Sequence, residues 1–192
     1  TAMDIYHIGE HEVTKNERRN AKAVNFGILY GISSFGLSED LGINVKDAKK
    51  FIDNYLETYP GIKDYMNNLI SKAHEDGYVK TMFGRKRVID ELSSANYMVK
   101  TSGERMALNT PIQGTSADIL KIAMIEIHKE LKKKNLKTKM IIQVHDELLF
   151  DTPRDEYDEV VSIIKEKMEG ACKLSVPLKV DIESGDSWYE AK

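Results

Sequence analysis

Cysteine is almost absent from this sequence of 192 residues, since Cys172 is the single example. One cysteine cannot form an internal disulfide or a multi-cysteine zinc site. The sequence also lacks an apolar run long enough for a membrane span and has no signal-peptide pattern, so we expect a cytoplasmic protein without a membrane partner. Its net charge of −3 excludes a uniformly basic nucleic-acid binder, and any binding of nucleic acid must rely on local groups of cations.

Helix signals dominate the first half of the chain. Hydrophobic residues make up 41% of the sequence, enough for a core in one or two compact units. Asn44 can cap one helix, Pro60 follows the end of that helix, and Gly77 ends the next. A longer helical pattern covers residues 97–131, and Pro111 should kink or divide it.

Strand signals lie mainly in the second half. Residues 139–150 predict a β-hairpin, and Val176–Glu183 alternates apolar and charged residues as a half-buried strand would. We therefore expect an α+β fold, divided near residue 94. Residues 1–94 are predicted to be mostly helical, and residues 95–192 to combine the hairpin with flanking helices.

The most informative pattern is a series of side chains spaced four residues apart. Arg18, Lys22, Phe26 and Tyr30 would share one face of a helix, and Gly31 closes the series. A rise of about 1.5 Å per residue separates Arg18 from Tyr30 by roughly 18 Å, close to the length of an extended nucleoside triphosphate. Guanidinium and ammonium groups suit phosphates, and aromatic faces suit bases. The series therefore predicts a nucleotide-binding stripe.

The start of this helix is signalled separately. Thr14 and Glu17 have the spacing of a capping box. An alternative reads the same helix as ordinary packing, with Phe26 and Tyr30 in a core and the cations in solvent.

Two carboxylates fall between the apolar runs of the predicted hairpin. Only His145, Asp146 and Glu147 separate the runs, so the acids would lie at its tip. Carboxylates suit Mg²⁺, which binds one or two of them together with phosphate oxygens in two-metal phosphoryl transfer. Taken alone, acids in a turn are also ordinary turn chemistry.

Together these motifs resemble a known family. The series from Arg18 to Gly31 resembles the fingers-helix motif of the bacterial DNA polymerase I family, called family A, and Val144–Glu147 resembles its palm carboxylate motif. Residues 104–118 are similar to the palm helix that lies near the primer-template, and residues 185–192 resemble the family's C-terminus. The resemblance covers essentially the whole chain and implies a fingers subdomain in residues 1–94 and the C-terminal part of a palm in residues 95–192.

One family motif has no counterpart here. Family members hold two metal ions between the hairpin aspartate and a second aspartate, in an Asp-Tyr-Ser-Gln-Ile-Glu-like strand upstream of the fingers. Residues 1–5 resemble the region just after that strand. We therefore expect a C-terminal polymerase fragment that is inactive alone, with the upstream parts of its own full-length chain as a partner.

The resemblance also implies the reaction and its residues. A primer 3′-hydroxyl attacks the α-phosphate of a deoxynucleoside triphosphate on primer-template DNA, with two Mg²⁺ ions. Asp146 would bind metal, Glu147 would act beside it, and His145 would contact the primer end. Lys22 and Arg18 would bind the triphosphate.

The remaining roles concern the base and the DNA. Phe26 would pack on the incoming nucleotide, and Tyr30 would guard the templating position. The other DNA contacts implied are Arg105, Asn109 and Gln113. The cations of Arg85–Arg87 would face nucleic acid, although a solvated loop explains them equally well. Helix-end hydrogen bonding beside Pro111 is an alternative for Asn109 and Gln113.

Other functions remain open from the sequence. A nucleotide or nucleic-acid binding module without catalysis would carry the same stripe. A different metal-dependent phosphotransferase or nuclease would leave the aromatic half of the stripe unexplained. A single-subunit RNA polymerase shares the cation-aromatic helix and the His-Asp pair, and Glu147 after that pair favours the DNA enzyme.

Overall fold

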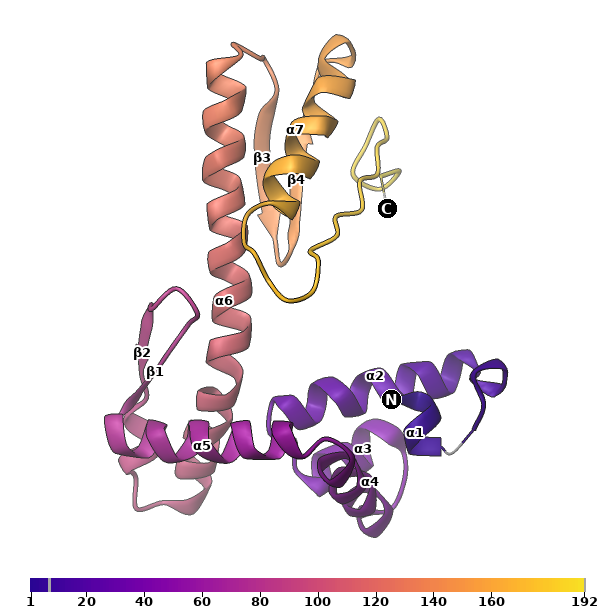
Figure 1. The fold of residues 1–192 in the computed structure, drawn as a ribbon, viewed down its shortest axis with the longest axis vertical. Coiled ribbons are helices and arrows are strands. Elements are labelled where there is room, and N and C mark those ends of the chain that lie inside the picture. The colour runs from indigo at the N-terminus through magenta and orange to yellow at the C-terminus, as the bar shows by residue number, and fades with distance from the viewer. Residues whose placement is uncertain (7, 192) are drawn as a thin grey trace. The chain divides into compact units, whose positions relative to one another are not determined.

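The computed structural model of the chain describes residues 1–6 and 8–191 (Figure 1). Lys192, the last residue of the family-like C-terminal segment, lies outside the described residues. The chain forms two compact units, Thr1–Gly114 and Thr115–Lys192, and their boundary falls within helix α6 (Tyr97–Lys133). Each unit has a core of its own and is described separately.

The first unit is built mainly from helices. Asn44 caps α4 as predicted, because its side chain accepts a hydrogen bond from the Asp47 N–H, and Gly77 ends α5 in the left-handed conformation with a φ of 73°. The helices before α6 are α1 (Ala2–Tyr6), α2 (Lys15–Leu29), α3 (Ser34–Leu41), α4 (Val45–Thr58) and α5 (Pro60–Asp76), with a 3₁₀ turn at Glu10–Glu12.

One core cluster joins α2, α3 and α4. Its buried members are Val24, Ile28, Leu37, Ala48 and Tyr55. The Tyr55 hydroxyl donates to the Asn25 side chain, and burial raises the pKa of Tyr55 above its ordinary value. This core holds the inner face of α2 against two other helices.

A second cluster packs a short hairpin against α5 and α6. Strands β1 (Tyr78–Lys80) and β2 (Lys86–Val88) pair antiparallel, and a 3₁₀ turn at Asp90–Ser93 follows. The buried members of this cluster are Ala73, Val79, Ile89, Leu92 and Ala107. A kink or a division was predicted at Pro111, and the division does not occur, since α6 continues through that residue. Side chains of the β1–β2 hairpin donate to α6 on both sides of Pro111, at Thr110 and at Gly114.

The second unit packs a hairpin and α7 (Tyr157–Glu169) against the C-terminal half of α6. Strands β3 (Lys139–Val144) and β4 (Glu147–Asp151) form the hairpin predicted for residues 139–150, with a bulge between Met140 and Ile142. The fully or partly buried residues of this core include Ile127, Leu131, Val160, Ile163 and Ile164.

The strand predicted at Val176–Glu183 does not form, because no strand among the described residues pairs with it. Its alternation nevertheless survives in the burial. Leu178, Val180 and Ile182 are partly buried, and Ile182 packs on the core of the second unit. The pattern therefore predicted which side chains turn inward and failed only on the backbone pairing.

The second unit also contains a carboxylate that ties two elements together. Glu156, at the end of a 3₁₀ turn (Arg154–Glu156), accepts hydrogen bonds from the backbone N–H groups of Lys137 and Thr138 and from the Thr138 hydroxyl. These bonds lower the pKa of Glu156 below its ordinary value of 4.5, the Lys137 N–H having the largest effect. The ionised carboxylate thus fixes the start of β3 beside the start of α7.

Glu156→Ala should lower the urea concentration at the midpoint of unfolding at pH 7, because three backbone and hydroxyl donors lose their acceptor. Because the pKa of Glu156 is lower in the folded state than in the unfolded state, its ionised carboxylate stabilises the fold fully at pH values above the unfolded-state pKa. This stabilisation is lost as the pH falls through the folded-state pKa. The difference between the two proteins should therefore shrink below about pH 4.5. Urea unfolding at pH 7 and pH 3, followed by circular dichroism, measures it.

The control is Glu159→Ala, which removes only the exposed ion pair with Lys134 and should change little. If the urea midpoints of Glu156→Ala and the unchanged protein differ by the same amount at pH 7 and at pH 3, ionisation of Glu156 does not stabilise the fold.

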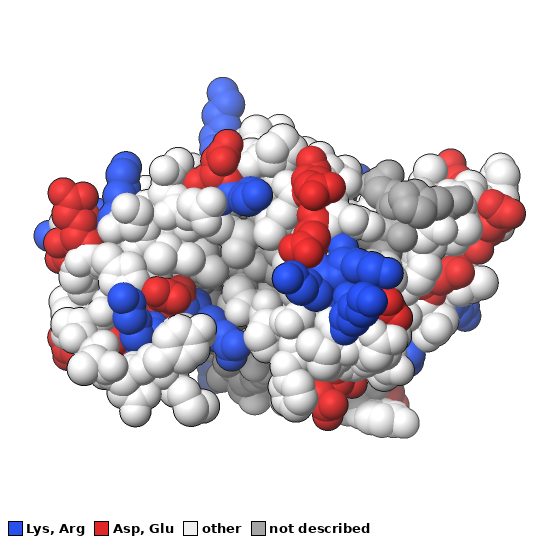
Figure 2. All heavy atoms as spheres, turned by 90° about the horizontal axis from the view of Figure 1, so that it is seen from below, with Lys and Arg blue, Asp and Glu red and all other residues white. Residues whose placement is uncertain are grey.

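The observed fold is α+β and mostly helical, as predicted, and the described residues form two antiparallel hairpins where one was expected. None of the described helices is both long enough and apolar enough to cross a bilayer. On the face shown in Figure 2, the cationic side chains gather in small groups next to acidic ones. Any electrostatic attraction for a polyanion must therefore come from such local groups.

Candidate nucleotide and nucleic-acid site

The predicted stripe lies on the exposed side of α2. Arg18, Lys22 and Phe26 belong to the helix and Tyr30 caps its end. Phe26 remains 46% exposed, so the alternative that placed its ring in a core is wrong. The buried residues of α2 occupy another face and are Ala21, Val24 and Ile28. Packing therefore uses one side of the helix and leaves the stripe accessible.

The helix begins where the sequence predicted. The Glu17 N–H donates to the Thr14 hydroxyl, and the Thr14 N–H donates to the Glu17 carboxylate at 2.6 Å. The second bond, from the Thr14 backbone, is the main reason that the pKa of Glu17 is lowered from its ordinary value. This capping box fixes the helix one turn before Arg18.

The side chains of the stripe contact one another in sequence order. The Lys22 Nζ lies 6.0 Å from the centroid of the Phe26 ring, at the outer limit of a cation–π contact. The rings of Phe26 and Tyr30 stack, with centroids 6.2 Å apart and planes inclined by 28°. Within the described residues, neither Arg18 nor Lys22 forms an ion pair. Both cations are therefore available for an anionic ligand.

The aromatic end of the stripe meets α6. Gly31 has a φ of 73°, and a Cβ built there would lie 2.9 Å from the Leu108 side chain and 3.4 Å from Cγ of Arg105. A side chain at this position would be strained and would collide with α6. Glycine thus allows the residue after Tyr30 to approach the helix that carries the predicted DNA contacts.

Those contacts share one face of α6. Arg105, Asn109 and Gln113 are four residues apart, and the side chains of Arg105 and Gln113 are exposed. Asn109 is partly buried, and its Oδ1 has no hydrogen-bond partner among the described residues. A buried acceptor without a hydrogen-bond partner costs about 1–3 kcal/mol. The helix-end alternative for Asn109 and Gln113 does not apply, because α6 does not end at Pro111.

The predicted acids lie at the tip of the second hairpin. His145 and Asp146 form the two-residue turn, while Glu147 is the first residue of β4 and pairs with Val144. All three side chains are exposed. His145 has a φ of 52°, which is uncommon outside glycine, and its carbonyl accepts a 2.8 Å hydrogen bond from the Gln143 side chain. The turn therefore presents two solvent-exposed carboxylates beside a histidine.

The acids fit part of a magnesium site. Exposed carboxylate oxygens are the ligands that Mg²⁺ prefers, and the ion commonly binds one or two of them. The described residues contain no group of three or more metal-ligating side chains. Asp146 and Glu147 could thus supply some ligands of such a site, with the others coming from substrate or from further protein segments.

Comparison with known proteins decides the family. A family model described as DNA polymerase family A matches residues 1–190. The chain belongs to that family. It is 52% identical to DNA polymerase I of Bacillus subtilis (strain 168) over 192 residues and 47% identical to that of Geobacillus stearothermophilus. The whole chain is matched in both cases, and it spans 22% of the length of each relative.

A solved structure agrees with the fold of this family A chain. The POL domain of Pol1 from M. smegmatis, in complex with DNA primer-template and dNTP, matches with a TM-score of 0.94 and 39% identity. The match covers 99% of this chain and 34% of that one.

Two arginines of this family A chain contact α6, and the sequence reasoning did not identify these contacts. The Arg87 guanidinium donates to the Thr110 hydroxyl at 3.2 Å and contacts Sδ of Met106, and Arg85 donates to the Gly114 carbonyl at 3.0 Å. Both side chains therefore brace α6 beside Asn109 and Gln113. The period of two in β2 places Arg87 opposite the buried Val79 and could have revealed its inward direction.

Proposed function

We propose that this chain is the fingers and part of the palm of an enzyme that performs template-directed DNA synthesis. The primer 3′-hydroxyl would attack the α-phosphate of a deoxynucleoside triphosphate, forming a phosphodiester bond and releasing pyrophosphate. The observation that carries the proposal is the exposed stripe on α2, with stacked aromatic rings at one end and, at the other, cations that form no ion pair with any described residue. Membership of DNA polymerase family A supports it.

The stripe residues would bind the nucleotide. Arg18 and Lys22 would bind the triphosphate and offset the charge on the departing pyrophosphate. Phe26 would pack on the incoming base and sugar, and Tyr30 would guard the templating position next to α6.

The helix α6 would hold the DNA. Arg105, Asn109 and Gln113 would contact primer or template from this one face of α6. Residues 1–94 would form the fingers subdomain and residues 95–192 the C-terminal part of the palm.

The hairpin acids would take part in a divalent-metal site. Asp146 would bind metal, Glu147 would act beside it, and His145 would contact the primer end. Two Mg²⁺ ions, when bound, would stabilise the attacking and leaving oxygens. The family resemblance places another metal-binding aspartate in a motif that these residues do not contain, so upstream parts of the full-length polymerase would complete the site. A cytoplasmic location is part of the same proposal.

Primer extension by two proteins tests this function. One is the chain alone, and the other is Bacillus subtilis DNA polymerase I in which the chain replaces the 192 residues that match it. We expect no extension of a primed template by the chain alone and Mg²⁺-dependent extension by the chimera. A folded chimera that binds primer-template but never extends it would contradict catalysis and favour a binding module. Extension by the chain alone would show that another acid completes the metal site.

Phe26→Tyr in the chimera should increase the use of dideoxynucleotides. The family carries either phenylalanine or tyrosine at this position, and phenylalanine accompanies discrimination against the missing 3′-hydroxyl. The exposed ring of Phe26 leaves room for the added hydroxyl, so the fold should be unaffected. Termination frequencies at equal ratios of dideoxynucleotide to deoxynucleotide measure the change. Identical frequencies for the two chimeras would refute the assignment of Phe26 to the nucleotide sugar.

A further inference from the structure

The β1–β2 hairpin has two chemically different faces. Its inner side chains, Val79 and Thr81, are buried against the rest of the unit, and Arg87 on this side donates to α6. The outer side chains are those of Tyr78, Lys80, Lys86 and Val88, with both lysines exposed and Val88 67% exposed. The outer face is therefore a free surface of the first unit.

Two lysines meet on this outer face. Lys80 and Lys86 are direct cross-strand partners, and their Nζ atoms lie 5.3 Å and 4.4 Å from the centroid of the same Tyr78 ring. Like charges directly opposite each other destabilise a sheet, although the aromatic ring offsets part of that cost. Neither lysine has an ion-pair partner among the described residues. An anion between the two ammonium groups would reduce their repulsion.

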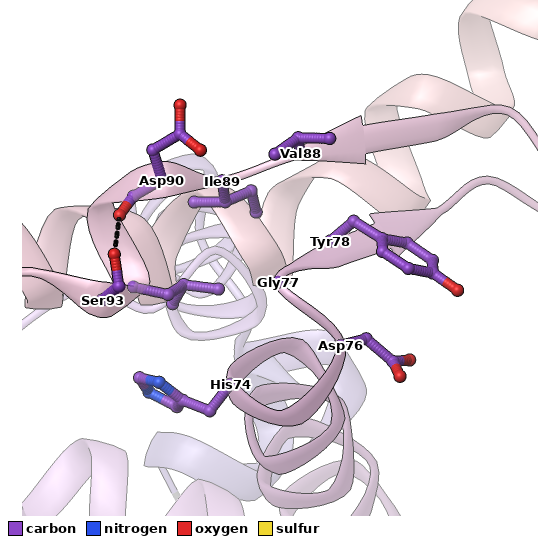
Figure 3. A pocket seen from close by; sticks show the side chains of 9 residues that line it. His74, Asp76, Gly77, Tyr78, Val88, Ile89, Asp90 and Ser93 are labelled. Carbon is purple, nitrogen blue, oxygen red and sulfur yellow. Dashed lines mark hydrogen bonds between the residues drawn. The ribbon is translucent and has the colours of Figure 1, made fainter.

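The surroundings of the pair are also cationic. Residues 78–88 contain four cations and no acid, although the whole chain is net negative. The nearest acids in the sequence, Asp76 and Asp90, lie at the base of the hairpin around a depression of about 250 Å³, and Figure 3 shows them with His74 and Tyr78. Arg85 and Arg87 already donate to α6. Of the four cations of the hairpin, the two lysines therefore have no ion-pair partner among the described residues.

We infer that Lys80 and Lys86, held by Tyr78, bind backbone phosphates of a nucleic acid on the outer face of this hairpin. The inference rests on the proposed function for the kind of anion and adds a contact surface separate from the α2 stripe and from the Arg105 face of α6. A phosphate beside the two ammonium groups removes their repulsion and releases counterions. The contact involves no base edge and is independent of sequence.

Fluorescence anisotropy with a labelled primer-template, measured over a series of salt concentrations, tests the inference in the chimera. The double variant Lys80→Gln/Lys86→Gln should bind about tenfold more weakly per lysine at 0.1 M salt, and the slope of log affinity against log salt should fall by about 0.9 per lysine. The matched control Lys63→Gln/Lys72→Gln removes two exposed lysines of α5 and should leave both quantities unchanged.

Two further measurements separate contact from folding. Because the free protein loses a like-charge pair, the Tm of Lys80→Gln/Lys86→Gln at low salt should equal or exceed that of the unchanged chimera. Tyr78→Phe keeps the aromatic ring and should bind normally, whereas Tyr78→Leu should weaken binding without any change of charge.

Binding measurements distinguish failure of this inference from failure of the proposed function. No binding of primer-template by the unchanged chimera contradicts both. Normal binding with an unaltered salt slope in Lys80→Gln/Lys86→Gln contradicts this inference alone, as does an equal loss in the Lys63→Gln/Lys72→Gln control. If inorganic triphosphate binding falls as much as DNA binding in the double variant, the pair is a site for small anions instead.

Discussion

Replacing Asp146 with alanine should reduce primer extension by the chimera to background. Asp146 is exposed in the two-residue turn of the β3–β4 hairpin, where its carboxylate is accessible to a divalent ion. Loss of that ligand removes the negative oxygen that Mg²⁺ requires, and the proposed chemistry depends on the ion. Asp146→Asn should have the same effect, because the amide keeps the size of the side chain and loses its charge.

The measurement is single-turnover extension with Mg²⁺ at saturating deoxynucleotide. Asp151→Ala serves as control, since it removes an exposed acid from the other end of β4, opposite Lys139. We expect that control to extend primers at the normal rate and both Asp146 variants to bind primer-template. Near-normal extension by Asp146→Ala would exclude a metal-binding role.

Lys22→Ala should lower kcat/KM for deoxynucleotide by roughly 10- to 150-fold. A hydrogen bond to a charged group contributes about 1.5–3 kcal/mol, and Lys22 has no ion-pair partner among the described residues that would compete for a phosphate. The Lys22 Nζ lies 6.0 Å from the centroid of the Phe26 ring, on the side of the stripe where the triphosphate would bind. Affinity for primer-template should not change.

Steady-state kinetics with varied deoxynucleotide at fixed primer-template measures this effect. The control is Arg19→Ala on the same helix, because Arg19 is not one of the four residues spaced four apart and its guanidinium donates to the Asn16 side chain at 2.8 Å. Equal kcat/KM values for Lys22→Ala and the unchanged chimera would remove Lys22 from the proposed site.

Local signals predicted much of the fold because they act within a few residues. Capping by Thr14 and Asn44, termination at Gly77 and the hairpin around His145 each depend on neighbours in the sequence. The sequence did not predict the hydrogen bonds of Arg85 and Arg87 to α6 on either side of Pro111, because these residues are distant from α6 in the sequence. The strand expected at residues 176–183 failed for the related reason that pairing needs a neighbouring strand.

The candidate site was predictable to a similar extent. Spacing alone placed the stripe on one face of α2 but could not show whether that face was buried. The exposure of Phe26 in the structure shows that it is not. Other features could not be inferred from any local pattern, since each is a contact between separate elements. Examples are the hydrogen bonds of Glu156 to the start of β3 and the lysine pair on Tyr78.

Gly31 limits which amino-acid substitutions this protein can accept. A side chain there would collide with Leu108 and press on Arg105, in a backbone conformation that side chains rarely adopt. The contact joins the end of the nucleotide stripe to the proposed DNA face of α6, so a substitution at residue 31 would disturb both surfaces together. Selection for altered nucleotide preference should therefore accept changes at Phe26 or Tyr30 far more readily than at the glycine behind them.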